Sequence, residues 1–230
     1  MSFAMPPVMR KILLSLFLVT GCMVGNNTDD ATGDDDGGDD QQMDPQQQNP
    51  DPTQQRTCSL PETSTDAGSL AAAKAQQCNV PQSGGTKKWY RVSASLPGTM
   101  DFIQIELWDG RGAFAAGAGA VAPGTYQLTG AELSPTTCGI CVRGLGDKGA
   151  ATQKEYFATS GTVQVTSVGT GGGAVSVTLT NARFQEIDAA KAPVSGGCAA
   201  PVSNAKIDGT IVVAGGGGGG GGNCPATVGD

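Results

Sequence analysis

The chain of 230 residues contains no histidine. Histidine is the commonest general base in catalysis, so its absence excludes the ordinary Ser–His–Asp and Cys–His nucleophilic sites. A zinc site is disfavoured too, because Cys138 and Cys141 form the only cysteine pair with a two-residue spacing and lack further ligands at a compatible spacing. We therefore expect no metal and no cofactor, and we do not expect an enzyme.

Large side chains are also scarce. Aromatic residues make up 5% of the chain, and the two tryptophans are Trp89 and Trp108. The 36 glycines oppose helix formation, whereas frequent Val and Thr favour the half-buried surface of a β-sheet. The composition predicts a mainly β fold with a lean hydrophobic core.

The chain has no cluster of Lys and Arg, although its net charge of −7 is substantial. Residues 23–56 carry nine Asp and one Arg, so the acidity belongs to this segment and the rest of the chain is nearly neutral. A protein that binds nucleic acid needs basic side chains to neutralise phosphates. We therefore exclude nucleic acid as a partner.

No apolar run is long enough to cross a membrane as a helix. Arg10 and Lys11 precede residues 12–20, "ILLSLFLVT". Nine helical residues span about 14 Å, against roughly 30 Å of hydrocarbon. A basic start followed by a short apolar run predicts a secretory signal peptide over residues 1–21, with Met1, Met5 or Met9 as its start.

The end of this run, Val19-Thr20-Gly21-Cys22, resembles the lipobox of bacterial lipoproteins. The resemblance implies that a type II signal peptidase cuts before Cys22, which carries a diacylglycerol thioether and usually an acylated amino group. Several acyl chains give stable attachment to a membrane. Met23 stands where Asp would indicate the inner membrane, so we expect a lipid anchor in the outer membrane. Both the periplasmic and the surface face of that membrane stay open as its location.

Residues 22–57 have few of the large apolar side chains that a folded segment buries. The stretch from residue 28 to residue 57 has no aromatic side chain and no aliphatic side chain larger than Ala. It cannot bury enough apolar surface to offset the entropy lost on ordering. We expect a lipid-anchored, acidic, disordered linker, followed by a single domain over residues 58–230.

Six cysteines remain after Cys22, an even number that predicts three disulfides in an exported chain. Six cysteines allow 15 pairings, and spacing alone does not decide among them. The working expectation is sequential pairing: Cys58–Cys78, Cys138–Cys141 and Cys198–Cys224. The first pair would enclose a short helix in the Ala-rich segment 69–78, and the last would close the glycine run 215–222.

The domain carries repeated period-two alternation of apolar side chains, typical of β-strands. Glycine- and proline-containing turns separate these segments, and Pro97-Gly98 joins the first two as a hairpin. The pattern predicts an antiparallel β-sandwich or a Greek-key barrel. The predicted strands lie at 87–96, 100–108, 124–133, 139–145, 161–168, 174–187 and 209–214.

Two stretches of the domain, the Thr-Cys-x-x-Cys turn and "YFATSGTVQVTSV" (156–168), are similar to the small cysteine-containing β domains of uncharacterised predicted lipoproteins. That similarity brings no activity with it. We expect a non-catalytic outer-membrane or surface-anchored lipoprotein, with a structural or ligand-binding β domain attached to the membrane through Cys22. The partner could be a protein or a carbohydrate.

Two alternatives stay open. An extracellular carbohydrate- or protein-binding module would expose Trp108, with Trp89, as an aromatic platform for a ligand. An enzyme could use Cys138 and Cys141 as a thiol–disulfide pair, which requires an accessible thiol. It could instead use Glu106 and Asp109 as paired carboxylates of a hydrolase.

Overall fold

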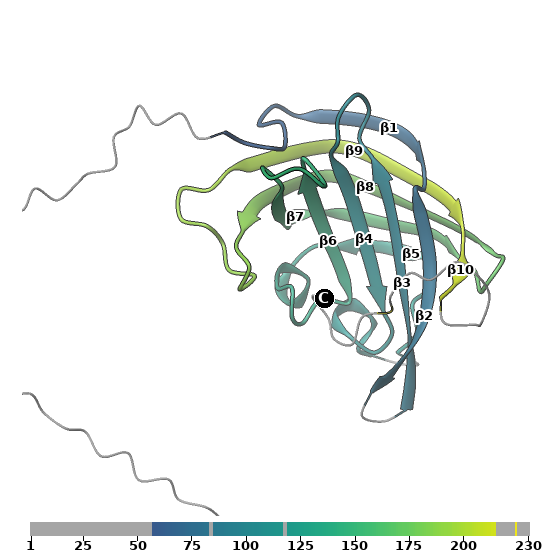
Figure 1. The fold of residues 1–230 in the computed structure, drawn as a ribbon. Coiled ribbons are helices and arrows are strands. Elements are labelled where there is room, and N and C mark those ends of the chain that lie inside the picture. Colours follow the sequence, from purple (N-terminus) through teal and green to yellow (C-terminus); the bar gives the residue numbers. More distant parts are fainter. Residues whose placement is uncertain (1–56, 83–84, 117–118, 215–223, 225–230) are drawn as a thin grey trace, which may run out of the picture. The chain divides into compact units, whose positions relative to one another are not determined.

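The computed structural model describes residues 57–82, 85–116, 119–214 and Cys224 (Figure 1). Cys22, the predicted signal peptide, the predicted linker up to residue 56 and the glycine run 215–222 lie outside the described residues. The strands are β1 (Thr65–Ala71), β2 (Lys74–Gln82), β3 (Gly85–Ser95), β4 (Phe102–Trp108), β5 (Gly124–Gln127), β6 (Ile140–Gly146), β7 (Lys154–Val168), β8 (Ala174–Ile187), β9 (Ala199–Thr210) and β10 (Val212–Val213), with the short 3₁₀ helices η1 (Gly112–Phe114) and η2 (Gly130–Leu133).

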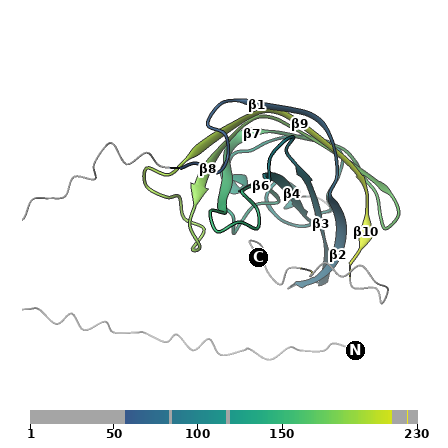
Figure 2. The same ribbon diagram turned by 45° about the horizontal axis from the view of Figure 1, so that its top comes forward.

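All the described strands belong to one 10-stranded sheet, which confirms the mainly β prediction. Along the sheet the order is β1-β9-β8-β7-β6-β4-β3-β2-β10, and β5 pairs with β7 off this path. Two pairs, β1 with β9 and β10 with β2, are parallel, so the sheet is mixed. It curls into a half-barrel (Figure 2), and the antiparallel sandwich or Greek-key barrel is not confirmed.

The hairpin of β3 and β4 shows why the sequence folds this way. Successive side chains of a strand point to opposite faces, so one face of β4 carries Ile103, Ile105 and Leu107, all fully buried. Val92 of β3 pairs with Ile105 in the antiparallel register. The predicted hairpin is therefore confirmed, and its apolar face packs in the core.

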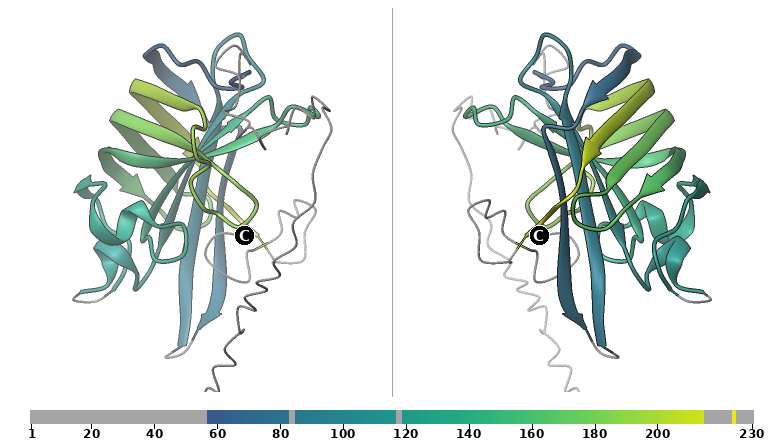
Figure 3. Two further views of the ribbon diagram at one scale, coloured as in Figure 1. Left: turned by 90° about the vertical axis from the view of Figure 1, so that its left-hand side faces the viewer. Right: turned by 90° about the vertical axis from the view of Figure 1, so that its right-hand side faces the viewer.

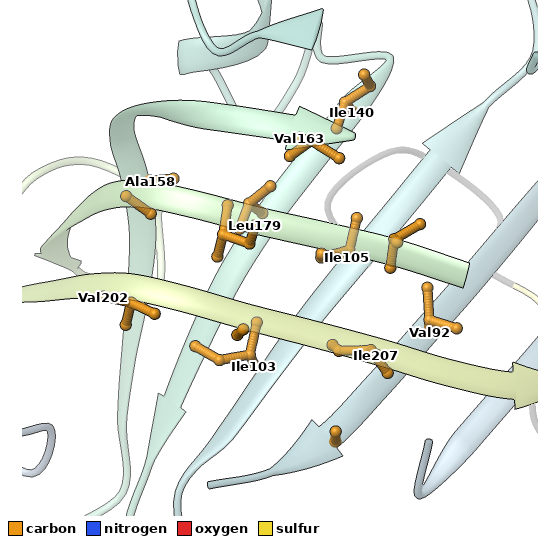
Figure 4. Close-up of a cluster of buried hydrophobic side chains, with 14 of the residues drawn as sticks. Val92, Ile103, Ile105, Ile140, Ala158, Val163, Leu179, Val202 and Ile207 are labelled. Atoms are coloured by element: carbon orange, nitrogen blue, oxygen red, sulfur yellow. The ribbon is translucent and has the colours of Figure 1, made fainter. Parts of the chain in front are cut away.

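The core lies between the two halves of the curled sheet. Strands β2, β3, β4 and β6 form one half, and β1, β9, β8 and β7 cross over them in the other (Figure 3). Side chains of β4 face those of β8 and β9 across the interior (Figure 4). The labelled members are Val92, Ile103, Ile105, Ile140, Ala158, Val163, Leu179, Val202 and Ile207.

The helix predicted over residues 69–78 is wrong. This segment instead contains the end of β1, two connecting residues and the start of β2. Burial in the sheet overrides the helical preference of its alanines, because β1 pairs with β9 while β2 pairs with β3. The partner strands, of which β9 lies far away in the sequence, decide the local structure.

At the connection between β1 and β2 the chain changes partners within two residues. The Ala72 N–H donates to the Asp208 carbonyl of β9 at 2.8 Å, and the Ala73 N–H donates to the Ser93 carbonyl of β3 at 2.8 Å. Small side chains allow this close crossing, since a Cβ on Gly209 would lie 2.6 Å from the Ala72 Cβ. The two halves of the sheet are joined at this corner.

Three disulfides are present, but two of the predicted pairings are wrong. Cys58 pairs with Cys198 instead of Cys78, and Cys78 pairs with Cys224. The reason lies in the strand order: Cys58 precedes β1 and Cys198 precedes β9, the parallel neighbour of β1. Cys78 lies on β2 beside β10, the strand that comes before Cys224 in the sequence.

The third predicted pair, Cys138–Cys141, is present. Only two residues lie between its members, so no distant strand pairing can redirect it. The three bonds together use Cys58, Cys78, Cys138, Cys141, Cys198 and Cys224.

Candidate functional site

Trp108 does not form the exposed ligand platform that the sequence suggested. Its side chain and that of Trp89 are 0% exposed, and their ring centroids lie 5.8 Å apart. They belong to a second apolar cluster on the face of the sheet opposite to the main core, together with Cys78, Val80, Cys138, Cys141, Phe157, Ile187 and Ala214. With few large side chains available, the fold uses both tryptophans for packing.

Glu106, one of the two predicted catalytic carboxylates, is fully buried beside the tryptophans. Its Oε2 accepts hydrogen bonds from the indole Nε1 of Trp89 at 3.2 Å and of Trp108 at 3.3 Å. Its Oε1 accepts from the Gln104 Nε2 at 2.7 Å. Glu106 thus satisfies two buried indole donors that would otherwise cost free energy.

Asp109, the other predicted carboxylate, has separate partners. One oxygen accepts from the Lys88 N–H at 3.1 Å and the other from the Val121 N–H at 2.8 Å. The carboxylate therefore joins the start of the hairpin to the loop after η1. Each acid of the predicted pair is committed to a structural contact of its own.

The Cys138–Cys141 bond closes a turn at the start of β6, and both cysteines are 0% exposed. The buried Glu132 holds this turn, because its Oε2 accepts from the N–H groups of Gly139 at 2.9 Å and Ile140 at 2.6 Å. Its Oε1 accepts from the Ala113 N–H of η1. In the described part of the chain, Cys138 is neither exposed nor placed at the start of a helix, as the reactive thiol of a redox pair would be.

A further group of side chains, of which the sequence pattern indicates only Glu106 as a candidate, forms a buried to half-buried polar layer next to the tryptophans. Alternation places them on the face opposite to the main core. We call this set the arginine layer, and its members are Gln76, Arg91, Gln104, Glu106, Arg143 and Glu155.

Strand register brings the members of the arginine layer together. Arg91 of β3 pairs with Glu106 of β4, and Gln104 of β4 pairs with Arg143 of β6. The Arg91 Nη2 donates to the Gln76 Oε1 at 3.0 Å. The two arginines thus lie on either side of β4 and border the same acid and amide.

An ion-pair chain continues the arginine layer toward the loop after β8. The Arg143 Nη1 lies 3.3 Å from the Glu155 Oε1, and the Lys191 Nζ lies 2.7 Å from the Glu155 Oε2. Arg143 is only 4% exposed. Buried guanidinium groups need both charge compensation and hydrogen bonds, and Glu155 supplies only part of this to Arg143.

The pKa of Arg91 is lowered by burial and by the nearby positive charge of Arg143. Burial is the larger cause, and the negative charge of Glu106 opposes the shift of the pKa. The guanidinium lies over the Trp89 ring, 5.2 Å from its centroid, and Arg111 lies over Trp108 at 5.4 Å. The aromatic faces stabilise these cations on the side away from the solvent.

Several buried donors of the arginine layer have no hydrogen-bond partner among the described residues: Arg143 Nε, Arg143 Nη2, Arg91 Nε and Gln76 Nε2. One buried acceptor of the layer, the Glu155 Oε1, also lacks a hydrogen bond among the described residues, although it forms the ion pair with Arg143. The layer therefore has more unpartnered buried N–H donors than unpartnered acceptors. A group that completes its hydrogen bonds has to be a hydrogen-bond acceptor.

The sequence carried one signal for this site. Arg91 alternates with apolar residues in the segment 87–96, which places it on the same face as Trp89 and opposite Val92. The strand order was not available from that pattern. Arg143 could not be assigned to the same layer without knowing that β6 lies beside β4.

One cluster has the composition of a metal site. Cys58, Glu62 and Cys198 place their ligand atoms within 4.8 Å of one another. The two sulfurs are joined in a disulfide, and a metal would need them as thiolates. The cluster does not offer a ligand set in this oxidation state.

Among the hollows that open to solvent are three that described residues line. The first, about 320 Å³, lies at the corner beside β10 and has Lys74 as its one charged lining residue. The second, about 290 Å³, and the third, about 120 Å³, share Arg183 of β8. None of the three has an acidic lining residue, so none provides the two carboxylates of a hydrolase.

We expect the free energy of unfolding to fall above about pH 10. Burial, and next the charge of Asp109, raises the pKa of Tyr90 above 10.0, and burial also raises the pKa of Tyr126. A raised phenol pKa favours the neutral form in the folded state, so this stability is complete below the unfolded pKa and is lost as pH rises through the folded pKa.

Urea unfolding at pH 8, 10 and 11 measures this loss. Tyr90→Phe should make the decline shallower, because the phenol that must ionise is gone. An equally steep decline in Tyr90→Phe would show that Tyr90 does not contribute to it.

No described helix is long and apolar enough to span a membrane. No protein-family model matches the chain, and neither a curated protein nor a solved structure matches it.

Proposed function

We propose that this is an exported, non-catalytic lipoprotein, attached to the outer membrane through lipid on Cys22, whose β domain binds a ligand. The observation that carries the proposal is the use of the cysteines. The three disulfides take six of the seven cysteines and leave Cys22, the lipobox residue, as the remaining one.

The disulfides support export, because such bonds persist in the periplasm and outside the cell and are rare in the reducing cytosol. Two of them close loops that include most of the domain, with sequence separations of 140 and 146 residues. A domain that depends on such bonds for its stability requires an oxidising compartment. The apolar run before Cys22 is the signal that would deliver the chain there.

A binding role is supported over a purely structural one by the arginine layer. A face with a structural role alone would normally satisfy its buried polar groups, yet Arg143 keeps two donors without a partner in the described structure. The enzyme alternatives have less support. Cys138 is fully buried in a disulfide, and Glu106 and Asp109 hold structural hydrogen bonds.

Between the two kinds of binding module, a protein or other polar partner has more support than a carbohydrate. The carbohydrate hypothesis relied on an aromatic platform, and both tryptophans are buried. Polar donors, by contrast, are abundant beside them.

Cys22→Ser tests the anchor. We expect the variant to leave the membrane fraction, while the unaltered protein stays there and its amino-terminal peptide carries the mass of the lipid. Membrane attachment of Cys22→Ser that survives washing at high salt would contradict the proposal. Intact-mass measurement should also show six protons gained on reduction, in agreement with the three bonds.

A further inference from the structure

The donors of Arg143 are arranged in a specific way. Its Nη1 faces Glu155, whereas Nε and Nη2 have no partner among the described residues. These two atoms form one edge of the planar guanidinium group, and their N–H bonds point in parallel. That edge matches the two oxygens of a carboxylate, which can accept both hydrogen bonds at once.

Arg91 adds a further donor to the same layer. Its Nη2 is engaged by Gln76, but its Nε is buried without a partner in the described structure. Arg91 and Arg143 lie on strands separated by β4 alone, so their backbones are about 10 Å apart. Long side chains of both strands can therefore approach a ligand above Gln104, the amide that pairs with Arg143.

The arginine layer is itself neutral, and Lys191, which pairs with Glu155, gives the extended group one net positive charge. Arg91, Arg143 and the neighbouring Lys191 carry three positive charges, against the two carboxylates of Glu106 and Glu155. One negative charge would balance the group, as a carboxylate does, whereas a phosphate dianion would leave an excess of negative charge. Burial makes such compensation important, because an unbalanced charge of low exposure is costly.

The arginine layer contacts solvent only at its margins. Arg143 and Glu106 are buried, but Arg91, Gln104 and Glu155 are half-buried. Entry of a small acid, or of the carboxylate of a larger molecule, therefore requires these half-buried side chains to move apart. Binding inside a partly desolvated layer strengthens each charge-assisted hydrogen bond.

We propose that the free edge of Arg143, together with Arg91, is a binding site for the carboxylate group of a ligand. This inference rests on the ligand-binding role proposed above and not on the membrane anchor. It names the chemical class of the ligand and the two residues that recognise it.

Acetate is the probe for the test, with the full chain kept soluble in detergent. Sodium acetate should raise the thermal midpoint of the protein in a concentration-dependent way, relative to sodium chloride of equal ionic strength. R143K keeps the positive charge but loses the bidentate edge, so we expect its affinity for acetate to be weaker by about tenfold or more. R183K, which changes an exposed arginine on β8, is the matched control and should bind acetate like the unaltered protein.

A second readout does not depend on a variant that folds. In the unaltered protein, the Nε–Hε resonance of Arg143 should shift during an acetate titration, while that of Arg183 should not. The inference would be overturned if the Arg143 resonance did not move or if chloride and acetate stabilised the protein equally. It would also be overturned if R143K bound acetate with unchanged affinity, or if the protein responded to phosphate but not to acetate. If the protein does not bind acetate but its membrane attachment depends on Cys22, only the proposed carboxylate site is wrong. If the protein attaches to the membrane without Cys22, only the proposed lipid anchor is wrong.

Discussion

Replacing both Cys58 and Cys198 with alanine should lower the free energy of unfolding by about 5 kcal/mol. Their bond joins residues 140 apart, so its loss frees a very long loop in the unfolded chain. In the chain-entropy account, the cost of removing a disulfide grows with the length of the loop that it closes. The same account gives an effect of similar size for the Cys78–Cys224 bond, whose separation is 146 residues.

The matched control is the double replacement of Cys138 and Cys141 with alanine. That bond closes a turn with a sequence separation of 3, so the same account gives a loss of about 2 kcal/mol. Denaturant unfolding at 25 °C under oxidising conditions measures both variants. Equal losses in the two would show that loop length does not govern the stability of this domain.

Glu106→Ala should lower the free energy of unfolding by about 3–5 kcal/mol. The substitution leaves the indole N–H groups of Trp89 and Trp108 buried without their acceptor. It also removes a negative charge beside Arg91, whose guanidinium is already crowded by Arg143. Lost hydrogen bonds to a charged group and uncompensated positive charge therefore act in the same direction.

Glu106→Gln separates these two contributions. The amide keeps an oxygen that can accept from the indoles but carries no charge, so we expect a smaller loss than in Glu106→Ala. The free energy of unfolding of both variants can be measured by monitoring tryptophan fluorescence during denaturation, because Trp89 and Trp108 lie at the site itself. If the two variants were equally destabilised, the charge rather than the hydrogen bonds would be the dominant contribution of Glu106.

The sequence predicts this fold as far as side-chain alternation reaches. Ile103, Ile105 and Leu107 share one face in the sequence pattern and in the structure, and the hairpin that contains them forms as expected. Alternation specifies which face of a strand is buried, because a shift of one residue would reverse every side chain. It does not specify which strands become neighbours.

The wrong predictions follow from that missing information. The alanines of residues 69–78 favour a helix in isolation, yet β9 and β3 draw the two ends of the segment into a sheet. The sequential disulfide pairing is wrong because strand order decides the partners: Cys198 meets Cys58 since β9 lies beside β1. Cys58 and Cys198 are 140 residues apart, and no local pattern predicts their contact.

The candidate site was less predictable than the fold. Trp108 drew attention as a large side chain, but a domain with few aromatic residues uses it for packing. The arginine layer draws on five strands, β2, β3, β4, β6 and β7, and the polar residues on each have the pattern of ordinary solvent-facing positions. Only their shared register turns Arg91 and Arg143 into one site.

The Cys58–Cys198 bond has a mechanical consequence. Cys58 lies just before β1 and Cys198 just before β9, and these strands run parallel. A pull transmitted through the residues before Cys58 therefore loads both strands at the same end. While the bond is intact, β1 cannot separate from β9 at that end, so the load passes on to the pairing between β9 and β8, which extends along almost the full length of β9.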